Sequence, residues 1–577
     1  MHELLAKVQA LKVAKPQAVG SLHTGLHSNS NSTQEAKSTT TGTGTGTGGA
    51  TRYNAKQLEF VQLAAQGASC VLIGAAGTGK TTCMKAVVNE LISSGTCGTT
   101  GNSGHQHLPD NSPAIVVCSF TRRAVANIRK QMPSELRRNC LTIHKLLEFQ
   151  PQPVDVQDEN GEWRTSKRFM PARDENNPLP ACIHTIIVEE SSMVGGTPFP
   201  QDDYLLFNQL VASLQHKVQF IFLGDIQQLP PVFGPAILGF KMLELPTIEL
   251  TEVYRQALES PIIRLAHRIL SGVPIAHSEL PAWQYPQQLS IKAFKRKLDE
   301  ETAIQTIAAY LKQQYDTDEW NADEDTVLLP FNKAVGTLEL NRHLATYIAQ
   351  QEQKVVYEIV AGFENLYLSV GDRVLIGRED AVVTRIERNK KYFGKAYAEE
   401  STTLNYWGYD SQLHNKVGIS MSDDDIDAMI QAMASDDDNY KRQSSHTVYY
   451  LKPDTDAELS LSNAGELNSL VLAYALTVHK AQGSEWRKVY LCLHYSHATM
   501  LQRELLYTAV TRAREELVVL CEHDSFVRGI TRQKIPGSSW QEKAEFFKGK
   551  LKTSAYLTSK TAALVAKATK LSSEEVE

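Results

Sequence analysis

Apolar runs followed by a polar turn and a helix-compatible stretch recur along the first half of the chain. The clearest run, residues 71–73, lies inside CVLIGAAGTGKTT (70–82), and further runs cover 114–118, 185–188 and 218–223. Short apolar runs separated by helical stretches are typical of buried parallel strands. The pattern therefore predicts an α/β fold with a doubly wound parallel sheet.

The strand-then-helix pattern returns in the second half, in TVLLPFNKAVGTLELN after Asp325 and again from Val471. Between these stretches the pattern is irregular and rich in β-branched and aromatic residues, which favours a small β-barrel-like insert. Six regions are expected: a tether (1–50), a first domain (51–324), a hairpin insert within it (147–182), a second domain (325–535), its β insert (about 356–469) and a lysine-rich tail (536–577).

The hairpin insert is predicted from Asn160-Gly161, which lies between two stretches of alternating residues. Trp163 and several arginines and lysines follow this turn. Aromatic rings together with positive charge suit binding to single-stranded nucleic acid. A surface hairpin without such a role is the alternative.

Composition narrows the class of protein. The chain has 577 residues, 42% of them hydrophobic and 21% charged, and its net charge is −6. No apolar run is long enough to cross a membrane. A nucleic-acid binder of this charge must hold its positive groups in a local channel. The Thr-Gly alternation at 41–48 predicts a flexible tether, and an organellar transit segment is the alternative for the N-terminus.

The eight cysteines are scattered and form no CxxC pair, which indicates reduced thiols in a cytoplasmic compartment. The prediction is bacterial or viral-host cytoplasm, or an organelle or nucleus if the source is eukaryotic. Neither a structural zinc site nor a disulfide framework is expected.

The stretch at 70–82 fits GxxxxGK[ST] and follows an apolar strand, as a phosphate-binding loop should. Glycines let backbone N–H groups approach a polyphosphate, and the following helix adds partial positive charge. Lys80 would reach the β- and γ-phosphates, and Thr81 would hold Mg²⁺. A glycine turn without a ligand is the alternative. The residues expected around the phosphates are Gly74, Ala75, Ala76, Gly77, Thr78, Gly79, Lys80, Thr81 and Thr82.

Two carboxylates, Glu189 and Glu190, follow the third strand. At a strand end beside a phosphate loop, one can hold Mg²⁺ and the other can orient or deprotonate an attacking water. Asp225 and Gln228 follow the fourth strand and are expected at the same ligand-binding edge.

Further candidates follow other strands. Ser119, Thr121, Arg122 and Arg123 suit a nucleic-acid backbone, with a solvated helix start as the alternative. His144 alone is ambiguous between a ligand and a packed histidine. Tyr254-Arg255 places a ring beside a guanidinium, which can stack on a base and neutralise a phosphate. After Val471 come Thr477, His479, Gln482 and Arg512.

Six blocks, GAAGTGKTT, EESSM, GDIQQLPPV, VYRQ, TVHKAQGSE and LYTAVTRAR, occur in order over residues 53–535. In this order they resemble the superfamily 1 DNA helicases of the RecD-like branch, which move 5′ to 3′ on single strands. The resemblance implies two RecA-like domains with ATP and Mg²⁺ between them. It also implies a hairpin-bearing insert in the first domain and an SH3-like insert in the second.

The resemblance also implies roles for single residues. Gln57 and Tyr254 would contact adenine, Glu190 would be the catalytic base, and Gln228 would sense the γ-phosphate. Arg255 and Arg512, with Lys80, would close on the transition state. Glu189 stands where the family usually has Asp, which alters the expected metal geometry. The residues expected along DNA are Ser119, Thr121, Arg122, His144, Trp163, Thr477, His479 and Gln482.

The function that follows is an ATP-dependent helicase in replication, recombination or repair. Its expected partners are single-stranded DNA, duplex junctions and, through the tails, replication or repair proteins, with no membrane partner. Three alternatives remain open: a translocase that does not unwind, an RNA helicase, and an ATP-binding scaffold with negligible turnover because of Glu189.

Overall fold

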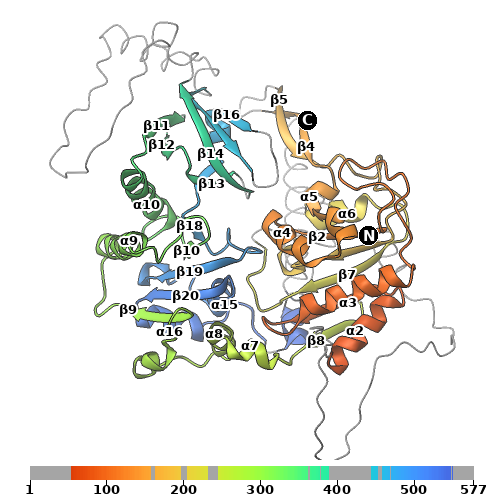
Figure 1. The fold of residues 1–577 in the computed structure, drawn as a ribbon, viewed down its shortest axis with the longest axis horizontal. Helices are drawn as coiled ribbons and strands as arrows, with labels where there is room; N and C mark the ends of the chain where they lie inside the picture. Colours follow the sequence, from red (N-terminus) through yellow and green to blue (C-terminus); the bar gives the residue numbers. More distant parts are fainter. Residues whose placement is uncertain are drawn as a thin grey trace, which may run out of the picture.

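The computed structural model describes residues 53–157, 163–196, 205–231, 245–361, 364–376, 379–388, 443–452, 458–467, 469–537, 539–546 and 549. The predicted tether, the Asn160-Gly161 turn and the end of the tail lie outside these residues. So do residues 423–438, a stretch rich in aspartate. In Figure 1 the two parallel sheets lie in separate lobes, with the β insert beyond the second sheet.

The first sheet has six parallel strands in the order β3-β2-β6-β7-β1-β8. The four apolar runs form four of these strands, which confirms the predicted α/β fold. The other two, β3 and β8, have the sequences CLT and TIEL and so lack a continuous apolar run that would mark them. The strands are β1 (Cys70–Gly74), β2 (Ile115–Ser119), β3 (Cys140–Thr142), β6 (Thr185–Val188), β7 (Gln219–Gly224) and β8 (Thr247–Leu250).

Helices cover both faces of this sheet. Phe60, Met84 and Ile128 pack on one face, and Ile143 and Phe207 pack on the other. These side chains belong to two apolar layers, one on each face of the sheet, as in a doubly wound domain. The helices are α2 (Ala55–Ala65), α3 (Lys80–Ser93), α4 (Arg122–Gln131), α5 (Ile143–Leu146) and α6 (Leu206–Ala212).

The second sheet has five parallel strands in the order β18-β10-β19-β20-β9. They are β9 (Leu289–Ala293), β10 (Thr326–Leu329), β18 (Ala475–Thr477), β19 (Trp486–Leu493) and β20 (Ala513–Cys521). Helices α9 and α10 pack on one face of the sheet, and α8, α15 and α16 pack on the other. These helices are α8 (Pro261–Leu270), α9 (Glu300–Asp316), α10 (Thr337–Gln351), α15 (Arg503–Val510) and α16 (His523–Thr531).

The boundary predicted at residue 325 is too late. Strand β9 pairs with β20 from Leu289↔Leu517 to Ala293↔Cys521, and α9 packs in the core of the second domain. The first strand of the second sheet therefore precedes Asp325. The sequence pattern missed this because the pairing joins strands more than 200 residues apart.

The predicted β insert is confirmed as an antiparallel sheet in the order β12-β11-β15-β14-β13-β17, with β16 paired to β15. Its SH3-like character stays a prediction. The strands are β11 (Val356–Ala361), β12 (Glu364–Ser369), β13 (Arg373–Ile376), β14 (Glu379–Arg388), β15 (Gln443–Leu451), β16 (Leu459–Asn463) and β17 (Leu470–Leu472).

The first-domain insert contains an antiparallel hairpin of β4 (Gln150–Gln157) and β5 (Trp163–Met170). The register runs from Gln150↔Met170 to Gln157↔Trp163, so the predicted turn joins the two strands. The hairpin is therefore confirmed, while its turn lies outside the described residues.

The segment after residue 535 is more than a tail. Residues 540–546 are helical, Trp540 packs against the core of the first domain, and Lys543 is buried. The Lys543 ammonium has a polar partner in the interior, Gln227 Oε1. All eight cysteines are free, and seven are buried. Within the described residues, no helix combines the length and apolar character needed to span a membrane.

Candidate nucleotide and nucleic-acid sites

The carboxyl ends of the parallel strands bring the predicted residues of the first domain to one edge of the sheet. The phosphate loop follows β1, Ser119 ends β2, Glu189 and Glu190 follow β6, and Asp225 follows β7. Because β1, β2, β6 and β7 all run in the same direction, the loops that follow them lie at the same edge.

The phosphate loop depends on glycine at two positions. Gly77 and Gly79 have φ values of +81° and +87°, in the left-handed region. A Cβ on Gly79 would also lie 2.7 Å from both Gln57 Nε2 and the Tyr254 ring. Helix α3 begins at Lys80 with no side-chain cap, so its first amides face the loop. The loop therefore has the geometry of an anion site.

Lys80 lies folded over this loop. Its ammonium donates hydrogen bonds to the carbonyls of Gly74 (2.6 Å) and Ala75 (3.2 Å). Thr81 and Thr82 lie in the first turn of α3 and are half-buried. The predicted cation and hydroxyls are thus placed together at the start of the helix.

Gln57 and Tyr254 meet beside the loop. Gln57 is fully buried, and its Nε2 donates to the Thr78 carbonyl (3.2 Å). Its Oε1 accepts hydrogen bonds from the Asn54 amide (3.0 Å) and the Tyr254 hydroxyl. The Tyr254 amide in turn donates to the Gly77 carbonyl (3.2 Å). The pair is therefore fixed against the loop from two directions.

Glu190 has φ +52° and ψ +40°, a left-handed backbone that is uncommon outside glycine. Its Oε2 is buried and has no hydrogen-bond partner. Strained backbone of this kind gathers at functional sites. Burial raises the pKa of Glu189 well above its usual value, and Glu190 raises it further, while Lys80 and Arg512 act in the opposite direction. Two carboxylates held close together fit a divalent cation that would offset their repulsion.

Gln228 is buried on the same edge, and its Oε1 also lacks a partner. The Ser119 hydroxyl is a third buried group without one. Buried polar groups are normally satisfied, and the exceptions need an explanation. These orphaned atoms beside the phosphate loop fit a site that takes a polar ligand.

Arg512 lies in the turn between α15 and β20 and is buried. Its guanidinium donates to the carbonyls of Thr508 (2.9 Å) and Ser484 (3.2 Å) and to the Thr511 hydroxyl (3.2 Å). Arg255 begins α7 (Arg255–Glu259), and its side chain lies outside the described part. The structure therefore brings Arg512, but not the Arg255 guanidinium, into the described site.

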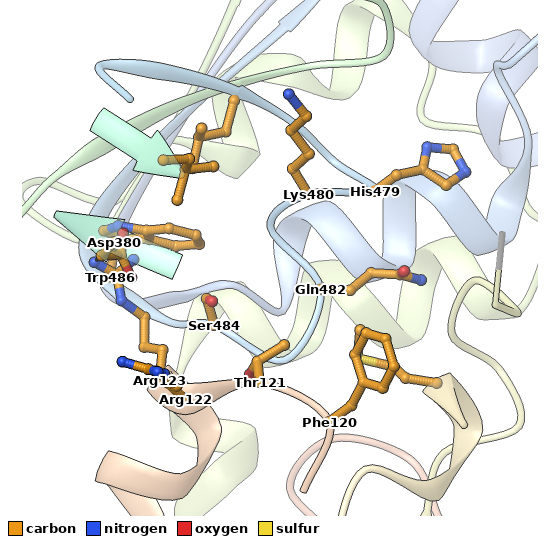
Figure 2. A pocket seen from close by; sticks show the side chains of 13 residues that line it. Phe120, Thr121, Arg122, Arg123, Asp380, His479, Lys480, Gln482, Ser484 and Trp486 are labelled. Carbon is orange, nitrogen blue, oxygen red and sulfur yellow. The ribbon is translucent and has the colours of Figure 1, made fainter. Parts of the chain in front are cut away.

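A pocket forms where the two domains and the β insert meet (Figure 2). The first domain contributes the start of α4, and the second domain contributes the loop after β18. Thr121 caps α4 and donates from Oγ1 to the Gly483 carbonyl (3.2 Å), which ties the domains together here. The predicted residues that line the pocket are Thr121, Arg122, His479 and Gln482.

Four other predicted DNA contacts lie elsewhere. Ser119 is buried at the end of β2, and Thr477 is buried at the end of β18. His144 lies on α5 between the rings of Phe120 (5.8 Å) and Phe149 (4.9 Å), an arrangement that favours the packed alternative. The side chain of Trp163 lies outside the described residues.

Arg123, which the sequence had grouped with Thr121 and Arg122, also lines the pocket, whereas sequence reasoning missed Asp380 and Trp486. The Arg123 guanidinium lies 4.5 Å from the centroid of a Trp486 ring and 3.4 Å from an Asp380 oxygen. The doubled arginine after Thr121 was the signal for Arg123. Asp380 gave none, because its place depends on how the insert packs.

Two families match parts of the chain. Residues 57–234 match the AAA domain family, and residues 472–520 match the UvrD-like helicase C-terminal domain family. The two matches fall on the two parallel-sheet domains.

The chain is similar over most of its length to two curated proteins. It is 27% identical over 450 residues to the ATP-dependent RecD2 DNA helicase of Deinococcus radiodurans, covering 77% of this chain and 46% of that protein. It is 20% identical over 479 residues to the RecBCD enzyme subunit RecD of Buchnera aphidicola, covering 80% and 71%. The chain thus spans about half the length of the Deinococcus relative.

Solved structures with a similar arrangement include two Pif1 helicases. A Bacteroides Pif1 complex with ADP-AlF3 and single-stranded DNA has a TM-score of 0.41 and 17% identity, covering 86% of this chain and 97% of that one. Pif1 from Candida albicans has a TM-score of 0.38 and 15% identity, covering 86% and 99%.

Proposed function

We propose that the chain belongs to the RecD-like branch of the superfamily 1 helicases and is an ATP-dependent DNA helicase that moves 5′ to 3′ on single strands. The observation that carries the proposal is the meeting of the domains at two places. α15 contacts the phosphate loop, and the loop after β18 lines a pocket with α4. A motor needs both contacts, because it must link nucleotide chemistry to its grip on a strand.

The nucleotide is proposed to bind at the carboxyl edge of the first sheet. Gln57 and Tyr254 would contact adenine, and the loop from Gly74 to Thr82 would surround the phosphates. Thr81 and Glu189 would hold Mg²⁺, which when bound supplies charge neutralisation at the phosphates. Because Glu189 is one methylene longer than Asp, its carboxylate reaches further from β6.

Hydrolysis is proposed to use groups that the structure leaves without partners. Glu190 would take a proton from the attacking water, and Gln228 would sense the γ-phosphate. Arg512 would supply charge at the transition state, which requires it to exchange some of its present carbonyl partners for phosphate. Arg255 would act beside it.

The nucleic-acid strand is proposed to follow the interdomain pocket, with Thr121, Arg122, His479 and Gln482 against its backbone. Ser119, Thr477 and His144 would support this path from neighbouring positions, and Trp163 would act on the hairpin. Contacts to the backbone carry little sequence information and make affinity depend strongly on salt. The β4–β5 hairpin would separate the strands at a duplex junction.

The biological setting is proposed as replication, recombination or repair in the cytoplasm, or in an organelle or nucleus of a eukaryote. Partner proteins would bind through the two tails, residues 1–50 and 536–577.

The test is strand displacement with ATP and Mg²⁺ on matched duplexes that carry either a 5′ or a 3′ single-stranded tail, with hydrolysis followed in the same samples. Unwinding of the 5′-tailed duplex alone is expected. Unwinding of only the 3′-tailed duplex would contradict the polarity, and binding of ATP and DNA without turnover would favour a scaffold. Greater stimulation of hydrolysis by RNA than by DNA would favour an RNA motor.

A variant with a shortened β4–β5 hairpin distinguishes a helicase that unwinds duplex from a translocase that does not. Val154 pairs with Ser166, so replacing residues 155–165 by Asn-Gly keeps the lower part of the hairpin and removes its upper part. The expected variant hydrolyses ATP on single strands and fails to displace a strand. Wild-type displacement by this variant would exclude the hairpin as the strand-separating element.

A further inference from the structure

Tyr507 of the second domain contacts the phosphate loop of the first domain. It lies on α15, is fully buried, and its hydroxyl accepts a hydrogen bond from the Ala76 amide of the phosphate loop (2.7 Å). The same hydroxyl donates to Asp225 Oδ2 (2.5 Å). One hydroxyl group from the second domain therefore joins two loops of the first.

The loop that contains Asp225 is held by two further contacts with the second domain. The Leu229 amide donates to Thr508 Oγ1 (2.9 Å), and the Leu229 carbonyl accepts from Gln482 Nε2 (2.9 Å). Gln228 lies inside this loop. A movement of the second domain would therefore shift Leu229, the residue next to Gln228.

Lys543, from the segment after the second domain, completes the arrangement. It is buried, and its ammonium donates to Gln227 Oε1. Burial lowers the pKa of Lys543, whereas the charges of Glu504 and Asp225 act to raise it. A buried carboxylate normally needs a compensating charge, and Lys543 supplies one near Asp225.

The Ala76 hydrogen bond is the contact in this network that lies in the phosphate loop itself. Amides of a phosphate loop are the groups that receive phosphate oxygens. In this structure the Ala76 amide is bound to Tyr507 instead. The Tyr507 hydroxyl is buried away from water, so it cannot replace a lost hydrogen bond from the Ala76 amide with one from solvent. If that bond is lost, the hydroxyl or Asp225 must change position. A rearranged loop would thus alter how α15 is held.

We propose that Tyr507 is a positioning residue that couples the state of the phosphate loop to the second domain's grip on single-stranded DNA, with Lys543 holding the loop of Asp225 through Gln227. The proposal rests on the proposed function, since it requires one chain to bind both ligands. Tyr507 acts through Ala76 and Asp225 and needs no contact with the nucleotide.

The test is the Tyr507→Phe variant of the full chain, which keeps the buried ring and removes only the hydroxyl. The quantity measured is the coupling factor, the ratio of the Kd for a labelled oligo(dT) without and with a non-hydrolysable ATP analogue. Removing a hydrogen bond to a charged group is expected to reduce this factor by about tenfold. The same loss must appear when nucleotide affinity is measured without and with oligo(dT), because binding coupling is reciprocal.

Tyr490→Phe is the matched control. Tyr490 is also a fully buried tyrosine of the second domain, and its hydroxyl donates to the Glu319 carbonyl (3.2 Å), away from the phosphate loop. This variant is expected to keep the wild-type coupling factor. Thermal unfolding of both variants then shows whether loss of a buried hydroxyl alone explains any change.

Lys543→Met is a second variant that does not alter Tyr507. It is expected to reduce coupling by about threefold, because Asp225 loses its compensating charge while the tyrosine link stays in place. Wild-type coupling in Tyr507→Phe would overturn the inference and leave the proposed function intact. A wild-type chain without any coupling between nucleotide and DNA would overturn both.

Discussion

The carboxyl edge of the first sheet differs from the edge of the second sheet beside Arg512, at the amino end of β20, in how polar side chains are used. At the first edge, Ser119 Oγ, Glu190 Oε2 and Gln228 Oε1 are buried without a partner. At the second edge, Arg512 makes three hydrogen bonds, and Gln482 reaches across to the first domain. The first edge has unsatisfied groups that a ligand can meet, whereas Arg512 and Gln482 at the second are already held in position.

This difference assigns separate tasks to two sheets of the same kind. Unsatisfied groups beside a phosphate loop mark the place where nucleotide chemistry would occur. Groups fixed by their own domain act on that chemistry only when the domains move relative to each other. Substitutions at the two edges should therefore fail in different ways, and the predictions below begin with the largest effect.

Lys80→Ala should abolish ATP hydrolysis, with a loss of at least about 100-fold, because the phosphate loop loses the cation that faces the β- and γ-phosphates. Binding of single-stranded DNA without nucleotide should persist. Steady-state hydrolysis and fluorescence anisotropy measure the two properties. Lys85→Ala, further along α3, is the control and should stay active. An active Lys80→Ala variant would show that ATP hydrolysis does not take place at the first edge.

Glu190→Gln should reduce the turnover rate by about 100-fold or more while nucleotide binding is kept, as expected for loss of a general base. The change preserves the size of the side chain at a backbone that already has φ +52°. Turnover and binding of a fluorescent ATP analogue measure the effect. Equal losses of binding and turnover would show that Glu190 supports the site's shape rather than its chemistry.

Arg123→Ala should weaken binding to single-stranded DNA by about three- to tenfold and reduce the salt slope by about one, as for a lost phosphate contact. Asp380→Asn should instead strengthen binding to single-stranded DNA, because it removes a negative charge from the pocket and frees Arg123 from its ion pair. Arg385→Ala, at an exposed ion pair of the same insert, is the control.

Kd measurements over a range of salt concentrations separate these outcomes. Tighter binding by Asp380→Asn with an unchanged salt slope in Arg123→Ala would mean that the carboxylate acts on the strand directly. Unchanged affinity in both variants would exclude this pocket from the strand's path.

Much of the fold and of the nucleotide edge could be predicted because the signals are local. The phosphate loop, Glu190 and Gln228 each lie within a few residues of a strand that an apolar run reveals. The pairing of β9 with β20, the contact of Arg123 with Asp380 and the burial of Lys543 depend on segments far apart in the chain. No local pattern encodes such contacts, so the second edge could be only partly predicted.

The smallest predicted effect concerns the pH dependence of strand binding through His479. Burial lowers the pKa of this imidazole, and the nearby Lys534 lowers it further, so His479 is neutral at pH 7 in the free protein. The pocket also holds Lys480, Arg122 and Asp380. A phosphate beside the ring would favour the imidazolium, so the complex takes up a proton and affinity rises as the pH falls. The expected gain from pH 8 to pH 6 is about threefold. Kd measurements should show this gain in wild type and not in His479→Asn. If the affinities of the two proteins change equally with pH, the His479 ring does not contact the strand.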